Sequence, residues 1–187
     1  MFAKINNDFL DHTIDYNQFN SRSMTGQHIG KRKGNSTFYL MKNYLKFKEL
    51  QLKNIFTIPP IVVRFVEFTG CGLVTPHTDI GGDTVSLNFY LTTSNDPTIF
   101  YEKKNCNVTT YVNTRGYNVN DLNEIGRFYA SPFDVYLLDV QSIHSIQKST
   151  DVPRTLITYR WKNYSFEEIF NSLNTEKILC MTKKNTS

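Results

Sequence analysis

The sequence predicts a mainly β fold with flanking helices, built as an antiparallel double sheet of the jelly-roll type. Pro59 and Pro60 close the N-terminal region, because proline disfavours continuation of a helix. From residue 61 onward, short stretches rich in β-branched and aromatic residues alternate with turn residues. These stretches are 61–69, 84–93, 98–102, 108–113, 127–130, 134–139, 144–148 and 154–162. About eight short strands separated in this way are typical of a jelly roll.

Length and composition fit one compact domain over residues 1–187. Hydrophobic residues make up 40% of the chain and aromatic residues 14%, which is enough for a packed core. We expect an N-terminal helical and loop region (1–60) that packs on the sheet, a jelly-roll core (61–162), and a C-terminal helix and tail (163–187).

The cysteines and the N-terminal sequence give information on the cellular compartment. Cys71, Cys106 and Cys180 form no metal or redox spacing, and their odd number fits free thiols in a reducing compartment. No apolar run approaches the roughly 18 residues that cross a membrane, and no signal-peptide pattern opens the chain. We therefore expect a cytoplasmic protein without membrane contacts. Oligomeric state has no signal in the pattern.

The N-terminal region carries weaker patterns. Residues 1–20 fit either a short helix or an edge strand. Residues 20–35 are polar and contain glycine, which predicts a loop. This loop is either a lid over the substrate, with Arg22 and Arg32 as contacts, or an exposed connection, which is the commoner case.

Two amphipathic helices are expected to flank the sheet. Ser36 is a candidate N-cap for a helix that runs to about Leu50, and its apolar stripe would be Phe38, Met41 and Leu45. A second helix is expected near Ser165, with two glutamates in its first turn. Its apolar side would be Phe166, Ile169, Phe170 and Leu173.

The chemistry of the sequence centres on His77 and Asp79. Residues two apart on a strand point to the same side, so both side chains can reach one metal ion. His144, at the start of another β-rich stretch, can complete a set of two imidazoles and one carboxylate. This set leaves the opposite coordination positions open, as in non-haem Fe(II) oxygenases. Zinc held by the same residues is the alternative.

An anion site is predicted beside this metal site. Arg154 lies ten residues after His144 and begins a strand on which Leu156, Thr158 and Arg160 share its face. A buried arginine requires an anionic partner, which a bound acid would supply. On another strand, polar Ser86, Asn88 and Tyr90 alternate with apolar residues, as expected for a strand that divides a site from an outer core.

The order His-x-Asp, distant His and then Arg resembles the Fe(II)- and 2-oxoglutarate-dependent oxygenases, most closely their prolyl-hydroxylase-like branch. The resemblance covers roughly residues 60–162: 84–91 resembles the strand after the metal motif, 98–101 the next strand, and 133–139 the strand before the second histidine. It implies a double-stranded β-helix of the jelly-roll or cupin type. It also implies 2-oxoglutarate and O2 as cosubstrates, with ascorbate as a candidate reductant.

The resemblance assigns roles to particular residues. His77, Asp79 and His144 would hold Fe(II). Arg154 and Tyr90 would bind the distal carboxylate of 2-oxoglutarate. Two further cosubstrate-binding residues would be Asn88, near the end of the cosubstrate closest to the metal, and Thr158, on the arginine face.

Two departures bear on the branch. The prolyl-hydroxylase-like pattern often has Gly-Gly-Glu-Thr where this chain has Asn95, Asp96, Pro97 and Thr98, which weighs against peptidyl proline as the substrate. An Arg-x5-Arg ending such as Arg154 and Arg160 resembles the nucleic-acid-demethylating branch. In that branch the second arginine helps to hold the cosubstrate. In this chain the second histidine, His144, lies nearer to the first arginine than is usual in that branch. We therefore expect Arg160 at a solvent edge.

Three functions remain open. The first is a hydroxylase of a peptide, protein side chain or small metabolite, with Asp79 favouring hydroxylation over halogenation. The second is a non-catalytic jelly-roll binding module with a structural metal or none. The third is a nucleic-acid-modifying oxygenase, suggested by the net charge of +4, although the basic residues show no clustering beyond 30–34 and the C-terminal end.

Overall fold

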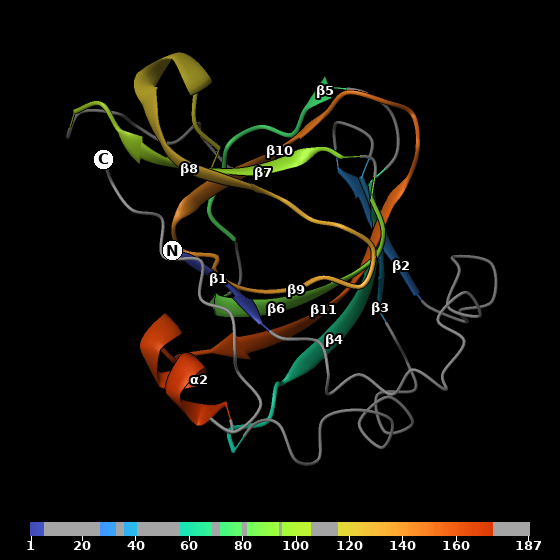
Figure 1. The fold of residues 1–187 in the computed structure, drawn as a ribbon, viewed down its shortest axis with the longest axis vertical. Helices are drawn as coiled ribbons and strands as arrows, with labels where there is room; N and C mark the ends of the chain where they lie inside the picture. The colour runs from blue at the N-terminus through green and yellow to red at the C-terminus, as the bar shows by residue number, and fades with distance from the viewer. Residues whose placement is uncertain are drawn as a thin grey trace.

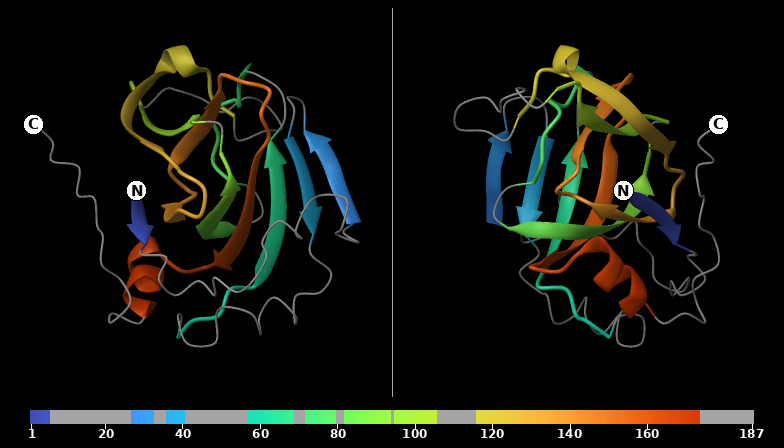
Figure 2. Two further views of the ribbon diagram at one scale, coloured as in Figure 1. Left: turned by 45° about the vertical axis from the view of Figure 1, so that its right-hand side comes forward. Right: turned by 90° about the vertical axis from the view of Figure 1, so that its left-hand side faces the viewer.

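Two antiparallel sheets face each other across the molecule (Figure 1). The computed structural model describes residues 1–5, 27–32, 36–40, 57–68, 72–79, 82–93, 95–105 and 116–173. In this part the larger sheet has the order β1-β9-β6-β11-β4-β3-β2, and the smaller sheet has the order β5-β10-β7-β8. The two further views in Figure 2 show the same two layers.

The elements have the following bounds. The larger sheet contains β1 (Phe2–Ile5), β2 (Gln27–Arg32), β3 (Ser36–Leu40), β4 (Val62–Phe68), β6 (Asp83–Thr92), β9 (Val135–Asp139) and β11 (Arg154–Lys162). The smaller sheet contains β5 (Gly72–Leu73), β7 (Pro97–Lys103), β8 (Leu122–Tyr129) and β10 (Ile143–Lys148). A short 3₁₀ helix, η2 (Val119–Asp121), precedes β8, and helix α2 (Phe166–Ser172) follows β11.

The predicted fold class is confirmed: the chain forms a jelly-roll or cupin-like double sheet. Strands β4, β6, β7, β9, β10 and β11 lie where the alternating pattern places them. The stretch 127–130 is the end of a longer strand, β8, and the stretch 108–113 lies outside the described residues. Residues 2–5 form a strand at one edge of the larger sheet, which decides between the two expectations for this segment.

The helix expected to begin at Ser36 is wrong over its first turn. Residues 36–40 form β3, which pairs with β4 in a register that places Phe38 opposite Val66. β-Branched and aromatic residues favour a strand, and the open edge of β4 supplies the hydrogen bonds that a helix would make internally. The remainder of the expected helix, with Met41 and Leu45, lies outside the described residues.

The loop expected over residues 20–35 is likewise wrong at 27–32, which form β2 at the other edge of the sheet. Arg32 is the last residue of that strand, and Arg22 lies outside the described residues. The described part of the N-terminal region therefore adds three strands to the larger sheet, β1 at one edge and β3 and β2 at the other, where a helical and loop cover was expected.

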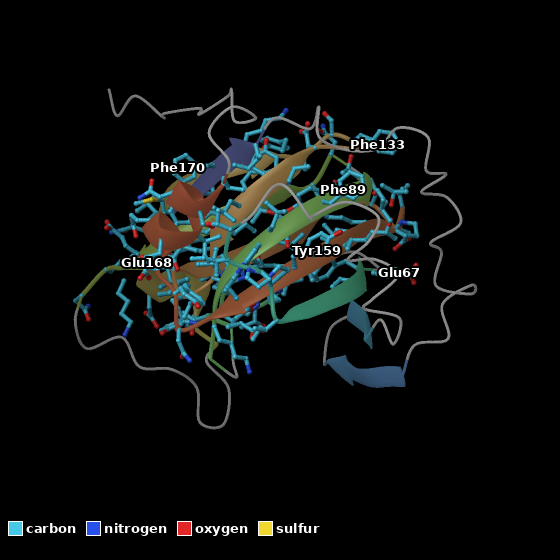
Figure 3. All side chains as sticks on the ribbon, turned by 90° about the horizontal axis from the view of Figure 1, so that it is seen from below. Glu67, Phe89, Phe133, Tyr159, Glu168 and Phe170 are labelled. Atoms are coloured by element: carbon cyan, nitrogen blue, oxygen red, sulfur yellow. The ribbon has the colours of Figure 1, made fainter. Side chains whose placement is uncertain are left out.

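Helix α2 covers the outer face of the larger sheet, as predicted. Ser165 caps it, and a capping box with Glu168 satisfies backbone donors at both positions. Ile169 is fully buried and belongs to the same core cluster as Leu87 and Phe89 of β6. Figure 3 views this face, with Phe89 and Tyr159 on the sheet and Phe170 on the helix. Within the described residues, no helix is long and apolar enough to cross a membrane.

A second core fills the space between the two sheets. Phe128 of β8 stacks on Tyr136 of β9 with ring centroids 3.9 Å apart, which joins the smaller sheet to the larger one. Tyr90, Phe100 and Leu156 belong to the same cluster. This core defines the inner face of the larger sheet, and the polar residues of β6 and β11 lie on that face.

Candidate metal centre

His77 and His144 are held side by side by their own backbones. The N–H of each donates to the carbonyl of the other, and both hydrogen bonds measure 2.9 Å. Directly opposed residues in an antiparallel pair project to the same side. The two imidazole centroids are accordingly 4.6 Å apart.

The hydrogen bonds of the imidazoles determine which nitrogen faces the site. Nδ1 of His77 lies 2.8 Å from the Thr75 carbonyl oxygen, and Nδ1 of His144 lies 2.9 Å from that of Ser142. A carbonyl can only accept, so each Nδ1 carries a proton and donates it. In the neutral imidazole this arrangement leaves the lone pair on Nε2, which is the tautomer that binds a metal ion.

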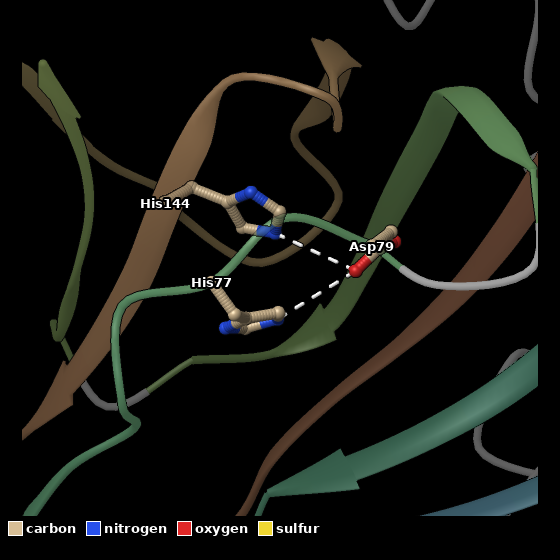
Figure 4. A group of neighbouring side chains, drawn as sticks. All are labelled: His77, Asp79 and His144. Atoms are coloured by element: carbon tan, nitrogen blue, oxygen red, sulfur yellow. Dashed lines mark ion pairs between the residues drawn. The ribbon is translucent and has the colours of Figure 1, made fainter. Parts of the chain in front are cut away.

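Asp79 brings a carboxylate oxygen to the two free nitrogens. Its Oδ1 lies 3.6 Å from Nε2 of His77 and 3.8 Å from Nε2 of His144 (Figure 4). These separations are too long for hydrogen bonds and comparable with those of ligands that share one ion. The ligand atoms all lie within 4.8 Å of one another and could hold a metal ion.

The charges of the three side chains suit a divalent cation. Burial, with a contribution from the neighbouring His77, lowers the pKa of His144 to about 4, so this imidazole is neutral at pH 7. Burial would raise the pKa of Asp79, but Arg160 and the two histidines outweigh it and hold that pKa well below its usual range. The carboxylate is therefore ionised. The residues present fit a metal ion held by one carboxylate and two imidazoles.

Arg160 does not lie at a solvent edge, and that expectation is wrong. Its side chain is only 11% exposed, and its guanidinium donates to Oδ2 of Asp79. Pairing of β11 with β6 places Arg160 opposite Ser86 and on the inner face. The alternation from Arg154 to Arg160 already assigned this face, but sequence alone did not show that Asp79 lies beside it.

Arg154 is buried on the same face, with 1% of its surface exposed. One guanidinium nitrogen donates to the Asp96 carbonyl at 2.9 Å, and the other donates to the Thr98 hydroxyl at 2.7 Å. Its central carbon lies 4.8 Å from the centre of the Tyr90 ring. Within the described residues it forms no ion pair with a carboxylate, and its Nε has no hydrogen-bond partner.

A row of polar atoms separates the two arginines. Asn88 pairs with Thr158 across β6 and β11, two positions along from the pair of Ser86 and Arg160 and therefore on the same face. Oγ of Ser86, Oδ1 of Asn88 and Oγ1 of Thr158 are buried and have no hydrogen-bond partner in the described part of the chain. Buried polar atoms without a partner cost free energy, so such atoms require water or a polar ligand as a partner. A row of such atoms between two cations fits a bound dicarboxylic acid.

The structure therefore brings together the three predicted metal ligands, and places the four predicted anion-site residues (Arg154, Tyr90, Asn88 and Thr158) on one face. Tyr90 lies under the guanidinium of Arg154 as a stacking partner, a contact that strand alternation did not predict. Arg160 and Asp96 were missed as contributors, because their contacts depend on strand register and on a turn.

No family model matches the sequence, and no curated protein matches it. Among solved structures, Bacillus subtilis oxalate decarboxylase matches with a TM-score of 0.39 at 12% identity, over 74% of this chain and 29% of that chain. The non-heme alpha-ketoglutarate-dependent epimerase SnoN from nogalamycin biosynthesis matches with a TM-score of 0.38 at 11% identity, over 55% of this chain and 48% of that chain. Vicilin from Capsicum annuum matches with a TM-score of 0.43 at 9% identity, over 73% of this chain and 30% of that chain. The matches thus cover less than half of each neighbour's length.

Proposed function

We propose that the protein is an Fe(II)- and 2-oxoglutarate-dependent oxygenase that hydroxylates a peptide, a protein side chain or a small metabolite. Dioxygen and 2-oxoglutarate would be consumed, and succinate and carbon dioxide would be released. The observation that carries the proposal is one of geometry. Three ligand atoms of His77, Asp79 and His144 converge, and on the adjoining sheet face Arg154 is buried and pairs with no carboxylate of the described residues.

The three side chains would hold Fe(II) on one face and leave the opposite positions open for the cosubstrate. When bound, the ion supplies Lewis acidity and the redox chemistry of dioxygen, which side chains cannot supply. Because Arg160 binds Oδ2 of Asp79, the carboxylate presents Oδ1 to the site. Because both Nδ1 atoms donate to backbone carbonyls, the imidazoles are already oriented with Nε2 toward the same point.

The remaining residues would bind and orient the acid. Arg154 would form a charge-assisted pair with the distal carboxylate, and this pair would give the guanidinium the anionic partner that the described part of the chain does not provide. The hydroxyl of Thr158 would donate a hydrogen bond to the bound acid. Tyr90 holds the guanidinium plane from below. The apolar core on either side of this row would exclude water from the bound acid.

The test is spectroscopic and then catalytic. Fe(II) and 2-oxoglutarate added together without oxygen should produce a visible metal-to-ligand charge-transfer band. Admission of oxygen should produce succinate. His77→Ala and Asp79→Ala should lose both signals, whereas Asp121→Ala, on the exposed η2 turn, should retain them. Absence of the band in the wild type, as expected of a non-catalytic binding module, or unchanged turnover in His77→Ala would overturn the proposal.

A second candidate, a nucleic-acid-modifying oxygenase of the same superfamily, is favoured by one observation. Arg160, the second arginine of the Arg-x5-Arg ending, is buried beside Asp79 and does not face solvent. Affinity for single-stranded DNA or RNA that falls steeply with salt would support this candidate. Absence of binding at low salt would exclude it.

A further inference from the structure

The turn that departs from the prolyl-hydroxylase-like pattern is the turn that holds Arg154. Asn95 adopts a left-handed backbone conformation (φ 58°), which asparagine tolerates better than most residues. The next residues approach the guanidinium, where the Asp96 carbonyl and the Thr98 hydroxyl each accept one N–H. Both contacts are buried. A guanidinium carries more donors than these two contacts use, and Nε has no hydrogen-bond partner among the residues that the structure describes.

The side chain of Asp96 fastens this turn to a second segment. Its Oδ1 accepts from the backbone N–H of Ser149 at 2.7 Å and from the Ser149 hydroxyl at 2.8 Å. Its Oδ2 accepts from Nζ of Lys148 at 3.2 Å. Asp96 and Lys148 are 2% and 5% exposed, so this pair is an interior one.

The segment so fastened is the connection between β10 and β11. Nζ of Lys148 also donates to the Val152 carbonyl at 2.6 Å, two residues before Arg154. Asp96 therefore reaches Arg154 by two routes: its carbonyl contacts the guanidinium, and its carboxylate anchors the chain that leads into Arg154. None of these contacts involves the metal ligands.

We propose that Asp96 is a positioning residue for Arg154, which holds the guanidinium so that its remaining donors meet the distal carboxylate of the bound acid. This inference rests on the proposed function. Lys148 belongs to the same arrangement, because its charge balances that of Asp96 and leaves Arg154 as the cation available to the ligand. Removal of the Asp96 and Lys148 side chains should weaken binding of the distal carboxylate and leave the metal centre intact.

The test compares two ligands. 2-Oxoglutarate and 2-oxobutanoate chelate iron through the same oxoacid end, but only the first has a distal carboxylate. Both are titrated into the Fe(II) protein without oxygen, with the charge-transfer band as the readout. The main variant combines Asp96→Ala with Lys148→Met, because removal of both charges avoids an unpaired buried ion. Thr98→Val is the second variant, since it removes the hydroxyl acceptor with little change in shape. Glu124→Gln, in an exposed ion pair, is the control.

We expect affinity for 2-oxoglutarate to fall about tenfold in the double variant, the order of effect seen when a supporting hydrogen bond is lost. Affinity for 2-oxobutanoate should change less than about twofold, and Thr98→Val should show the same split if the double variant fails to fold. In turnover, the KM for 2-oxoglutarate should rise while kcat stays near that of the control. Equal weakening of both ligands, or no weakening of either, would overturn the inference. Absence of any band in the wild type would overturn the proposed function, and this inference with it.

Discussion

Arg160 and Asp79 form an ion pair in which the guanidinium takes Oδ2 and leaves Oδ1 facing both imidazoles. The guanidinium thereby compensates the charge of a buried carboxylate when no metal ion is bound. It also restricts Asp79 to one ligand atom. The pair joins the proposed metal centre to the polar face of β11.

The first prediction concerns this pair. Arg160→Met should lower the free energy of unfolding of the metal-free protein by about 2 kcal/mol, below the range for fully buried pairs because both groups are slightly exposed. Mn(II) should restore more stability in this variant than in the wild type, since the ion replaces the missing positive charge. Thermal denaturation with and without Mn(II) measures both effects.

The control for this prediction is Arg127→Met, which breaks an exposed ion pair with Glu124. Exposed pairs contribute less than about 1 kcal/mol. If Arg160→Met lowers the free energy of unfolding no more than Arg127→Met does, and Mn(II) stabilises both variants equally, Arg160 does not compensate the charge of Asp79.

The second prediction concerns Arg154. Arg154→Met should weaken binding of 2-oxoglutarate about 100-fold, because a charge-assisted pair contributes up to about 3 kcal/mol. Binding of Mn(II), measured by calorimetry, should stay within about twofold of the wild type, because Arg154 contacts none of the metal ligands. Loss of metal binding and acid binding in parallel would show that the residue supports the fold and not the ligand.

The third prediction concerns the orphaned hydroxyl of Thr158. Thr158→Val keeps the shape and removes a buried polar atom that has no partner in the described structure. Stability without ligand should therefore be unchanged or rise by up to about 1 kcal/mol. Affinity for 2-oxoglutarate should fall about fivefold, since a hydrogen bond to the acid is lost. A stability loss with unchanged affinity would assign the hydroxyl a structural role.

The fourth prediction concerns the turn before His144. Asp139 accepts the backbone N–H of Gln141 at 3.0 Å and the hydroxyl of Ser142 at 2.6 Å. The Ser142 carbonyl in turn accepts from Nδ1 of His144. Asp139→Ala should loosen this support and weaken Mn(II) binding about tenfold. Asp121→Ala serves as the control, and equal metal affinity in the two variants would contradict the prediction.

Local patterns were sufficient to predict much of the site. Strand alternation put Arg154, Thr158 and Arg160 on one face, a relationship that extends over a few residues and depends only on the two-residue period of a strand. The same period predicted that His77 and Asp79 reach one ion, although in the structure His77 forms only an isolated bridge and Asp79 lies between β5 and β6. The fold class followed from short stretches rich in β-branched and aromatic residues, separated by turn residues along the chain.

The remaining features depend on contacts between distant segments. The role of Arg160 depends on the register that sets it opposite Ser86, beside the segment that carries Asp79. The contact of the Asp96 carbonyl with Arg154 depends on a turn that meets β11 only in the folded protein. At Ser36, a residue that suits a helix N-cap lies instead at the start of a strand, because the edge of β4 was available for pairing.

The central claim is that His77, Asp79 and His144 hold one divalent ion between them. Equilibrium dialysis against Fe(II) without oxygen at pH 7 measures the number of ions bound per chain. We expect one iron per chain in the wild type and none in Asp79→Ala or His144→Ala at the same free iron concentration. A wild type that binds no iron, or variants that bind as much as the wild type, would contradict it.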